Sequence, residues 1–324
     1  MDNTLTIDED NAGQRFDKFL IRLFPIGGKG FVYKMLRKKR VKLNGNRAQG
    51  SEILREGDVV TLYISPETQK ILAKPLVSCD NLGKGLALKV LLKVLYEDKD
   101  ILVVNKPANC LTHPDLTAAA AASAIGSIFR PVAVNRLDRN TTGIVILAKT
   151  LPAAQELSLA LKEGHIEKLY LAAVAGEIDK AMVLKGSHIK DKKTNKAAVG
   201  SYNIDNNLDN PKEVVTEIEP VWSGDGLSLL KIKLVTGRSH QIRAHLQSIG
   251  RPVIGDPKYG DSSLNSLFRE KHGVSAQMLH AWRLRFGGLG RRLGYLNGFE
   301  VVCRPDGALG EFIKLNSKGF DPNV

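Results

Sequence analysis

The sequence predicts an α+β protein with a small N-terminal part and a larger C-terminal part. Its 324 residues exceed a typical single domain, for which about 150 residues is a usual size. Apolar residues recur with helical spacing near the N-terminus, whereas short apolar runs typical of buried strands begin the larger part. With 43% hydrophobic residues the chain can bury a full core, which excludes a disordered or collagen-like protein.

Two helices, a hairpin and a strand are expected in residues 1–65. Apolar residues have the spacing of one helix face in two stretches: Phe16, Phe19, Leu20 and Leu23, then Phe31, Val32, Met35 and Leu36. The second helix is expected to end in the basic run 37–40. Asn44-Gly45 predicts a tight turn, and the apolar run 59–64 predicts a strand.

The rest of the chain divides into a linker and the larger part. Residues 66–92 contain prolines and glycines without clean periodicity, so we interpret them as a linker. The larger part, 93–324, begins with a predicted strand at 101–104, which Asn105-Lys106-Pro107 should end.

Positive charge is concentrated near the N-terminus. The chain has 47 Lys and Arg against 34 Asp and Glu, a net charge of +13. Residues 14–47 hold eleven of these basic residues and one acid, Asp17, which accounts for +10. A charge run of this kind is often only a solvated helix end. Two basic helix faces in one compact module instead favour a polyanionic partner whose phosphates they would contact.

Several other kinds of site are not expected. Cys79, Cys110 and Cys303 form no CxxC pair, which argues against a disulfide framework or a zinc site and fits a reducing compartment. There is no phosphate loop, dinucleotide fingerprint, HExxH or GxSxG motif, so we expect no cofactor and no metal. The acidic start lacks the apolar core of a signal peptide, and no apolar run would span a membrane. We therefore expect a cytoplasmic protein with no membrane partner.

A charged loop, residues 135–143, leads directly into the apolar run 144–149. Asp138 follows Arg136 by two residues and precedes Arg139. Such an aspartate is commonly a turn residue or half of a surface ion pair. The alternative is a catalytic carboxylate that nearby cations keep ionised.

The N-terminal part resembles the small RNA-binding domain named after ribosomal protein four of the small subunit. The matching stretches are 13–20, 36–45 and Glu56-Gly57-Asp58. This resemblance implies binding to structured RNA. The residues expected to contact its phosphates are Arg15, Lys18, Lys34, Arg37, Lys38, Lys39 and Arg40.

The larger part resembles the RNA pseudouridine synthases that include ribosomal large-subunit synthases A, C and D. Arg136-Leu137-Asp138 matches the segment that carries the catalytic aspartate of the family, here Asp138. Residues 168–176 are similar to the segment whose tyrosine packs on the target base, here Tyr170. Residues 236–246 match the segment whose arginine pairs with the aspartate, here Arg243. With 250–260 and Leu279-His280-Ala281, the similarity extends over 93–316.

This resemblance implies a fold and an activity. The fold would be α+β, with a large mixed, mostly antiparallel central sheet and flanking helices. The activity would be site-specific isomerisation of uridine to pseudouridine in large-subunit (23S) ribosomal RNA, by base flipping and an essential aspartate. The partner would be this RNA or its assembly intermediates, and we expect a monomer. The N-terminal basic run is most similar to the C subgroup. D-type activity at other uridines and a catalytically idle assembly factor are the alternatives.

The proposed roles have local support in the sequence. The fork of Arg243 can hold a carboxylate through two N–H groups, and a helix with Ser239 as N-cap and Gly250 as its end would carry it. Tyr170 offers a flat face for a flipped base, and Arg136 could fill the gap that the base leaves. One departure stands out: Asn135 replaces the histidine that usually precedes Arg-Leu-Asp.

Overall fold

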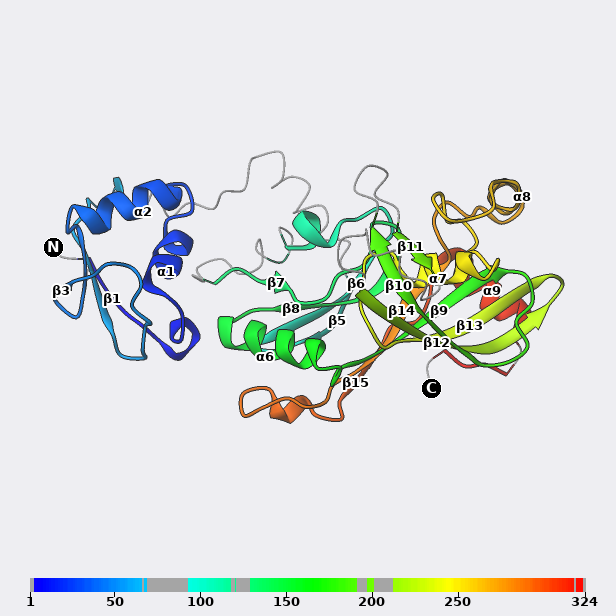
Figure 1. Cartoon of the computed structure of the whole chain (residues 1–324). Coiled ribbons are helices and arrows are strands. Elements are labelled where there is room, and N and C mark those ends of the chain that lie inside the picture. Colours follow the sequence, from blue (N-terminus) through cyan, green and yellow to red (C-terminus); the bar gives the residue numbers. More distant parts are fainter. Residues whose placement is uncertain are drawn as a thin grey trace.

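The N-terminal part builds a sheet and a hydrophobic core of its own, at one end of the molecule (Figure 1). The computed structural model describes residues 3–65, 67–68, 93–117, 120, 129–190, 197–200, 212–317 and 319–322. The elements of the N-terminal part are β1 (Asn3–Thr6), η1 (Glu9–Asn11), α1 (Phe16–Leu23), α2 (Gly28–Arg37), β2 (Val41–Leu43), β3 (Asn46–Arg47) and β4 (Val59–Leu62). The strands lie in the order β1-β4-β2-β3, and each pair is antiparallel.

The predicted helices and turn of this part are present. The apolar face of α1 and that of α2 are buried in one cluster that also includes Val60 and Leu62 of β4. Asn44 and Gly45 have φ values of 50° and 73°, and they join β2 to β3. Two expectations were wrong in detail. Helix α2 ends at Arg37, because the backbone turns to a left-handed φ of 57° at Lys39. Strand β1 was not expected, and pairing with β4 creates it.

The larger part is organised around one sheet of eleven strands, ordered β11-β10-β12-β13-β9-β14-β8-β6-β5, with β15 beside β14 and β7 beside β8. Its strands are β5 (Lys93–Glu97), β6 (Ile101–Lys106), β7 (Val132–Ala133), β8 (Thr142–Ala148), β9 (Glu167–Ala175), β10 (Met182–Lys190), β11 (Ala197–Gly200), β12 (Lys212–Gly224), β13 (Leu227–Leu234), β14 (Leu279–Arg285) and β15 (Glu300–Val302). Only β14 and β8 pair in parallel among the pairings of the described residues. The expected mixed, mostly antiparallel α+β fold is thus confirmed.

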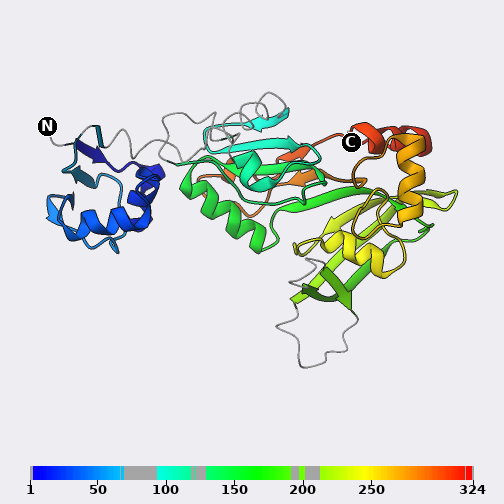
Figure 2. The ribbon, with the colours of Figure 1, turned by 90° about the horizontal axis from the view of Figure 1, so that it is seen from above.

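Helices cover both faces of this sheet. They are α6 (Leu151–Lys162), α7 (Gln241–Ser248), α8 (Ser262–His272) and α9 (Gly307–Asn316), with the short turns η2 (Thr112–Leu116) and η3 (Gly294–Leu296). Alternation along β9 separates the faces: Tyr170 packs in the cluster that contains residues of α7, whereas Leu171 packs in the cluster that contains residues of α8 and α9. Figure 2 shows α8 and α9 at the end of the molecule away from the N-terminus. The residues predicted to form a site must therefore be sought on the α7 face, where Tyr170 lies.

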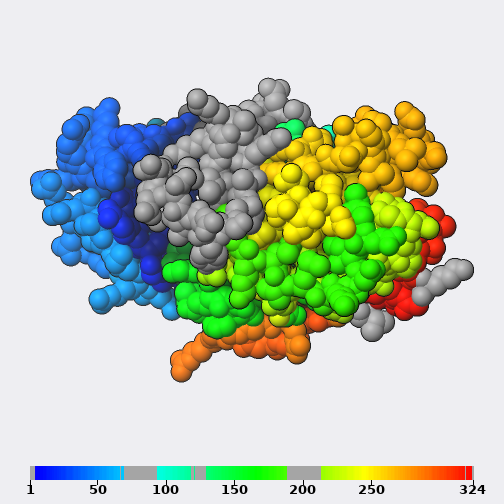
Figure 3. Space-filling view, turned by 45° about the vertical axis from the view of Figure 1, so that its right-hand side comes forward, coloured from blue at the N-terminus to red at the C-terminus, as the bar shows by residue number. Residues whose placement is uncertain are grey.

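Arg292 connects the two parts. Its guanidinium contacts Asp10 of the N-terminal part at 2.5 Å and the fully buried Asp100 of the larger part at 2.6 Å. Arg22 of α1 also lies over the ring of Phe129, 5.6 Å from its centroid. The N-terminal residues, blue in Figure 3, thus pack at one end of the larger part.

The expected linker, residues 66–92, lies outside the described residues apart from 67 and 68. None of the helices in the described part of the chain has the length and apolar character needed to cross a membrane.

Candidate active site

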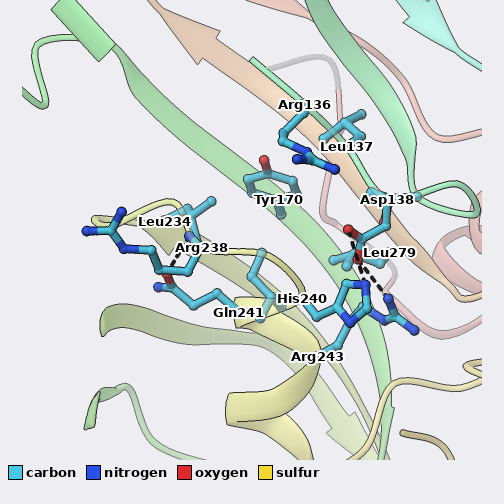
Figure 4. Close-up of a pocket in the computed structure, with 12 residues that line it drawn as sticks. Arg136, Leu137, Asp138, Tyr170, Leu234, Arg238, His240, Gln241, Arg243 and Leu279 are labelled. Atoms are coloured by element: carbon cyan, nitrogen blue, oxygen red, sulfur yellow. Dashed lines mark hydrogen bonds and ion pairs between the residues drawn. The ribbon is translucent and has the colours of Figure 1, made fainter. Parts of the chain in front are cut away.

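Three segments that are distant in the sequence meet at one pocket (Figure 4). The loop before β8 contributes Asp138, strand β9 contributes Tyr170, and the first turn of α7 contributes Arg243. These residues line a cavity of about 60 Å³. A larger cavity of about 390 Å³ shares Asp138 and Arg243 with it. The structure therefore brings together the three residues for which the sequence predicted catalytic roles.

Asp138 and Arg243 form an ion pair across the pocket. Arg243 Nη1 donates a hydrogen bond to Asp138 Oδ2 at 2.7 Å. The Asp138 side chain keeps 24% of its surface exposed, whereas that of Arg243 keeps only 6%. A carboxylate with one oxygen on a buried cation and a face open to the pocket is suited to act on a bound substrate.

The Arg243 cation has a second carboxylate partner, Asp256. Nε and Nη2 donate to the two oxygens of Asp256 at 2.7 and 2.8 Å. Burial lowers the pKa of Arg243, but the hydrogen bonds and charges of Asp256 and Asp138 raise it by more, so the net shift is upward. The guanidinium is therefore charged throughout the pH range in which the protein is folded.

Tyr170 forms one wall of the pocket. The residue is 6% exposed, and it packs in the core cluster with Ile242 and Leu279. Burial, and secondly the negative charge of Asp138, raise the pKa of Tyr170. Its side chain is thus a fixed aromatic surface that carries a protonated hydroxyl at neutral pH.

Arg136 lies at the mouth of the same pocket. Its side chain is exposed and lines both cavities, and Figure 4 shows it on the side of Tyr170 and Asp138. Arg136 thus places an exposed cation at the rim of the pocket.

His240 is a pocket residue for which the sequence predicted no role. Its Nε2 lies 3.9 Å from Asp138 Oδ1, and its Nδ1 lies 3.0 Å from the Tyr259 hydroxyl. Burial lowers the pKa of His240 despite the opposing charge of Asp138, which favours the uncharged ring near neutral pH.

His240 is also the N-cap of α7, which corrects the expectation for Ser239. The backbone at His240 is left-handed, with a φ of 58°, and helical geometry begins at Gln241. The Gln241 side chain satisfies the preceding turn: its Oε1 accepts hydrogen bonds from the Thr236 hydroxyl and the Arg238 N–H. The helix therefore starts later than it would with Ser239 as its N-cap.

Lys106 stabilises the loop that carries Asp138. The residue is fully buried, and its Nζ donates to the carbonyl oxygens of Pro107, Cys110 and Arg139 at 2.9 Å. Burial lowers the pKa of Lys106 to about 8, although the charges of Cys110, Asp138 and Asp115 act in the opposite direction. The backbone directly after Asp138 is thus held by a buried cation.

Asn135, the departure from the usual histidine, also has a structural role in this loop. Its Nδ2 donates to the Ile144 carbonyl at 3.1 Å, and its Oδ1 accepts from the Ile146 N–H at 2.8 Å. An asparagine can satisfy both groups of strand β8 because its amide carries a donor and an acceptor. The loop that carries Asp138 is therefore packed without the histidine.

The seven basic residues that were predicted to contact RNA phosphates are exposed, and they lie in or beside α1 and α2, not in the elements that line the pocket. They are Arg15, Lys18, Lys34, Arg37, Lys38, Lys39 and Arg40. Arg15 is engaged by Asp17, at 2.9 Å, and Tyr33 donates its hydroxyl to the same carboxylate. The structure does not bring this basic surface into the pocket.

Sequence reasoning missed His240, Lys106 and Asp256 as parts of the site. Asp256 stands in the segment 250–260 that resembles the family, which was the one available indication of importance. Lys106 looked like the polar end of a strand, and nothing in the local pattern predicts that a lysine is buried there. Among the described residues, no three His, Cys, Asp or Glu side chains are grouped as metal ligands.

Comparisons with known proteins show which proteins this chain is similar to. Residues 100–248 match the family model described as RNA pseudouridylate synthase. Ribosomal large subunit pseudouridine synthase C of Vibrio vulnificus is 32% identical over 86% of this chain and 87% of that protein. The protein of the same name from Haemophilus influenzae is 31% identical over 87% of this chain and 86% of that protein. Ribosomal large subunit pseudouridine synthase D of Xanthomonas campestris is 30% identical over 86% and 83%.

Solved structures show the same fold. Human RNA pseudouridylate synthase domain containing 4 has a TM-score of 0.59 at 22% identity, over 72% of this chain and 96% of that one. Its relative, domain containing 1, has a TM-score of 0.51 at 23% identity, over 69% and 94%. The family model and the relatives confirm the resemblance of the larger part to the RNA pseudouridine synthases.

Proposed function

Because this chain belongs to the RNA pseudouridylate synthase family and is an isomerase that acts on RNA, we propose that Asp138 is its essential catalytic carboxylate and that large-subunit ribosomal RNA is its substrate. The observation that carries the first part is the Asp138–Arg243 pair, at 2.7 Å, beside the Tyr170 ring in one pocket. The names of the relatives support the second part.

The reaction needs a carboxylate but no net oxidation or reduction. The bond between the uracil nitrogen and the ribose carbon breaks, and the uracil turns. Its C5 then bonds to the same ribose carbon. C5 loses its proton, and the ring nitrogen that was released gains one. Atoms and electrons balance within the nucleotide, so no group needs to be carried away. Asp138, paired with Arg243, would act on the ribose or the base when the first bond breaks.

Tyr170 and Arg136 would hold the nucleotide for this step. A uridine in folded RNA is inaccessible until it is flipped out of its stack. The buried ring of Tyr170 offers a rigid face for the uracil, and one stacked base contributes about 1–3 kcal/mol. Arg136, exposed at the rim, would occupy the gap left in the RNA.

The N-terminal part would supply affinity for RNA. We propose that residues 1–65 are an RNA-binding domain, 66–92 a linker and 93–324 the catalytic domain. The exposed cations of α1, α2 and the following turn lie away from Asp138, which suits contacts with phosphates distant from the target uridine. The enzyme would act as a cytoplasmic monomer that binds RNA and not a membrane.

Mapping of pseudouridine in ribosomal RNA tests this function. Cells that lack the protein should lose pseudouridine at specific large-subunit uridines, and the unchanged protein should restore it. Asp138→Asn should fail to restore it. The positions lost would also separate the C-type from the D-type assignment. Loss of no large-subunit pseudouridine would contradict the proposed substrate.

A further inference from the structure

We propose that Asp256 is a positioning residue: it holds one edge of the Arg243 guanidinium so that the group presents a single N–H donor, Nη1, to Asp138. This inference rests on the proposed catalytic role of Asp138. Asp256 would act through Arg243, and its own carboxylate would not contact the substrate.

The division of the donors on Arg243 carries the argument. A guanidinium has five N–H groups in one plane. The edge formed by Nε and Nη2 is occupied by Asp256, in two bonds of 2.7 and 2.8 Å. A planar group fixed at two points cannot rotate, so the direction of Nη1 toward Asp138 is set as well.

Asp256 is itself fixed before any RNA binds. It has no exposed surface, and its Oδ1 accepts the backbone N–H groups of Lys258 and Tyr259 at 2.8 and 3.1 Å. Asn265 of α8 donates to the Asp256 carbonyl at 2.9 Å. Gly255 has a φ of 75°, and a Cβ atom there would lie 2.4 Å from the Ala276 carbonyl oxygen. The loop that carries the carboxylate is therefore tightly constrained.

The charge of Asp256 persists in this buried place. Burial raises the pKa of Asp256, but the hydrogen bond and charge of Arg243 and the two backbone N–H groups lower it by more. The ring of Tyr259 adds a third contact, since its centroid lies 4.9 Å from the guanidinium carbon of Arg243. The arginine is thus clamped on the side that faces away from the pocket.

The consequence for Asp138 is that only one of its oxygens is engaged by Arg243. Oδ2 accepts the bond from Nη1, whereas His240 Nε2 lies 3.9 Å from Oδ1, beyond hydrogen-bonding distance. If Asp256 were absent, the free fork of Arg243 could grip both oxygens of Asp138 or turn away from it. The first change would occupy the oxygen that the ribose or base must reach, and the second would leave the carboxylate without its paired cation.

The test uses the full-length protein and large-subunit ribosomal RNA purified from cells that lack it. Asp256→Asn keeps the size of the side chain and removes its charge. We expect kcat to fall by ~10- to 100-fold, the scale of a misplaced catalytic group, while the Kd for RNA stays within ~2-fold. Asp100→Asn is the matched control, because Asp100 is also fully buried and paired with an arginine, Arg292, away from the pocket. It should lower the melting temperature but leave kcat within ~2-fold.

A double-mutant cycle separates positioning from a merely structural role. In the Arg243→Lys background, which lacks the fork, Asp256→Asn should lower kcat by less than ~3-fold further. An equal factor in both backgrounds, or a loss no greater than that of Asp100→Asn, would overturn the proposal. If Asp256→Asn does not fold, Asp256→Glu retains the charge but moves it by one methylene, and full activity of that variant would also overturn it. Asp138→Asn is measured in the same assay. If Asp138→Asn remains active, the proposed catalytic role of Asp138 fails. If Asp256→Asn remains active while Asp138→Asn does not, only the positioning role of Asp256 fails.

Discussion

Arg243 Nη1 and Asp138 Oδ2 lie 2.7 Å apart, although the two residues are 105 positions apart in the chain. The pair joins the first turn of α7 to the loop before β8, and Tyr170 of strand β9 lines the same pocket. Burying an arginine is costly unless carboxylates compensate its charge, and here two of them do so. The charge balance of the core is thus tied to the geometry of the pocket.

Replacement of the proposed catalytic carboxylate should separate chemistry from binding. Asp138→Asn keeps the shape of the side chain and removes the charge that Arg243 pairs with, so we expect pseudouridine formation to fall by at least ~10²-fold. The Kd for RNA should stay near that of the unchanged protein. Both are measured on a large-subunit ribosomal RNA fragment, by pseudouridine formation and by filter binding. Activity within ~10-fold of the unchanged enzyme would exclude the assigned role.

The ring of Tyr170 should matter more than its hydroxyl. Because burial raises the pKa of Tyr170, the hydroxyl stays protonated at neutral pH and is a poor base. We expect Tyr170→Phe, which keeps the aromatic face, to lose less than ~10-fold in kcat, which is below the ~10²-fold or more expected for a lost acid–base group. Tyr170→Ala should lose ~10-fold or more in kcat/KM, as about 1–3 kcal/mol of stacking disappears. A fall of ~10²-fold in kcat for Tyr170→Phe would show instead that the hydroxyl moves a proton.

The basic surface of the N-terminal part should determine affinity and its salt dependence. Replacement of Arg37, Lys38, Lys39 and Arg40 by Ala removes up to four exposed cations. The plot of log binding constant against log salt should become less steep by up to ~3–4, because each phosphate contact contributes roughly 0.7–0.9. The rate at saturating RNA should change little, since the pocket is untouched. An unchanged slope together with a collapsed saturated rate would place these residues in the catalytic cleft.

A short stem-loop substrate provides the control for this experiment. It is too small to engage the basic surface and the pocket at once. Replacement of the four basic residues should therefore weaken binding of the stem-loop less than binding of the full ribosomal RNA.

Acid should destabilise the fold through His280. Its Nε2 donates to the Cys303 carbonyl at 2.8 Å, so Nδ1 is the acceptor for the Thr142 hydroxyl, at 2.7 Å, and the buried ring is neutral. Burial lowers the pKa of His280 to about 4, despite the opposing hydrogen bond of Cys303 and the charge of Asp306. In the unfolded chain the pKa is about 6.5. The unfolded state therefore binds the proton first, and stability is lost as the pH falls from about 6.5 toward about 4.

The free energy of unfolding, measured in urea at a series of pH values, checks this expectation. The decrease attributable to His280 should reach roughly 3 kcal/mol, since one unit of pKa corresponds to about 1.4 kcal/mol. His280→Gln should show a shallower decrease over the same pH range, whatever its stability at neutral pH. Identical slopes for the two proteins would mean that other groups cause the acid sensitivity.

Local patterns determined a large part of this protein. The periodic apolar residues of α1 and α2, the Asn44-Gly45 turn and the apolar runs of β6 and β8 were readable because each depends on neighbours within a few residues. Asp138, Tyr170 and Arg243 were identified from short segments that resemble the family. The structure brings these three together, while their catalytic roles stay predictions.

Only the tertiary structure decided which side chains surround those three. Strand β1 exists through its pairing with β4, and α7 starts after a left-handed His240 because its first turn is fitted to the pocket. Lys106 is buried because three carbonyl oxygens from two loops converge on its ammonium, and Asp256 meets Arg243 because α7 and the loop before α8 pack side by side. Burial and charge pairing are properties of segments that meet in space. A pattern read along the chain does not contain them.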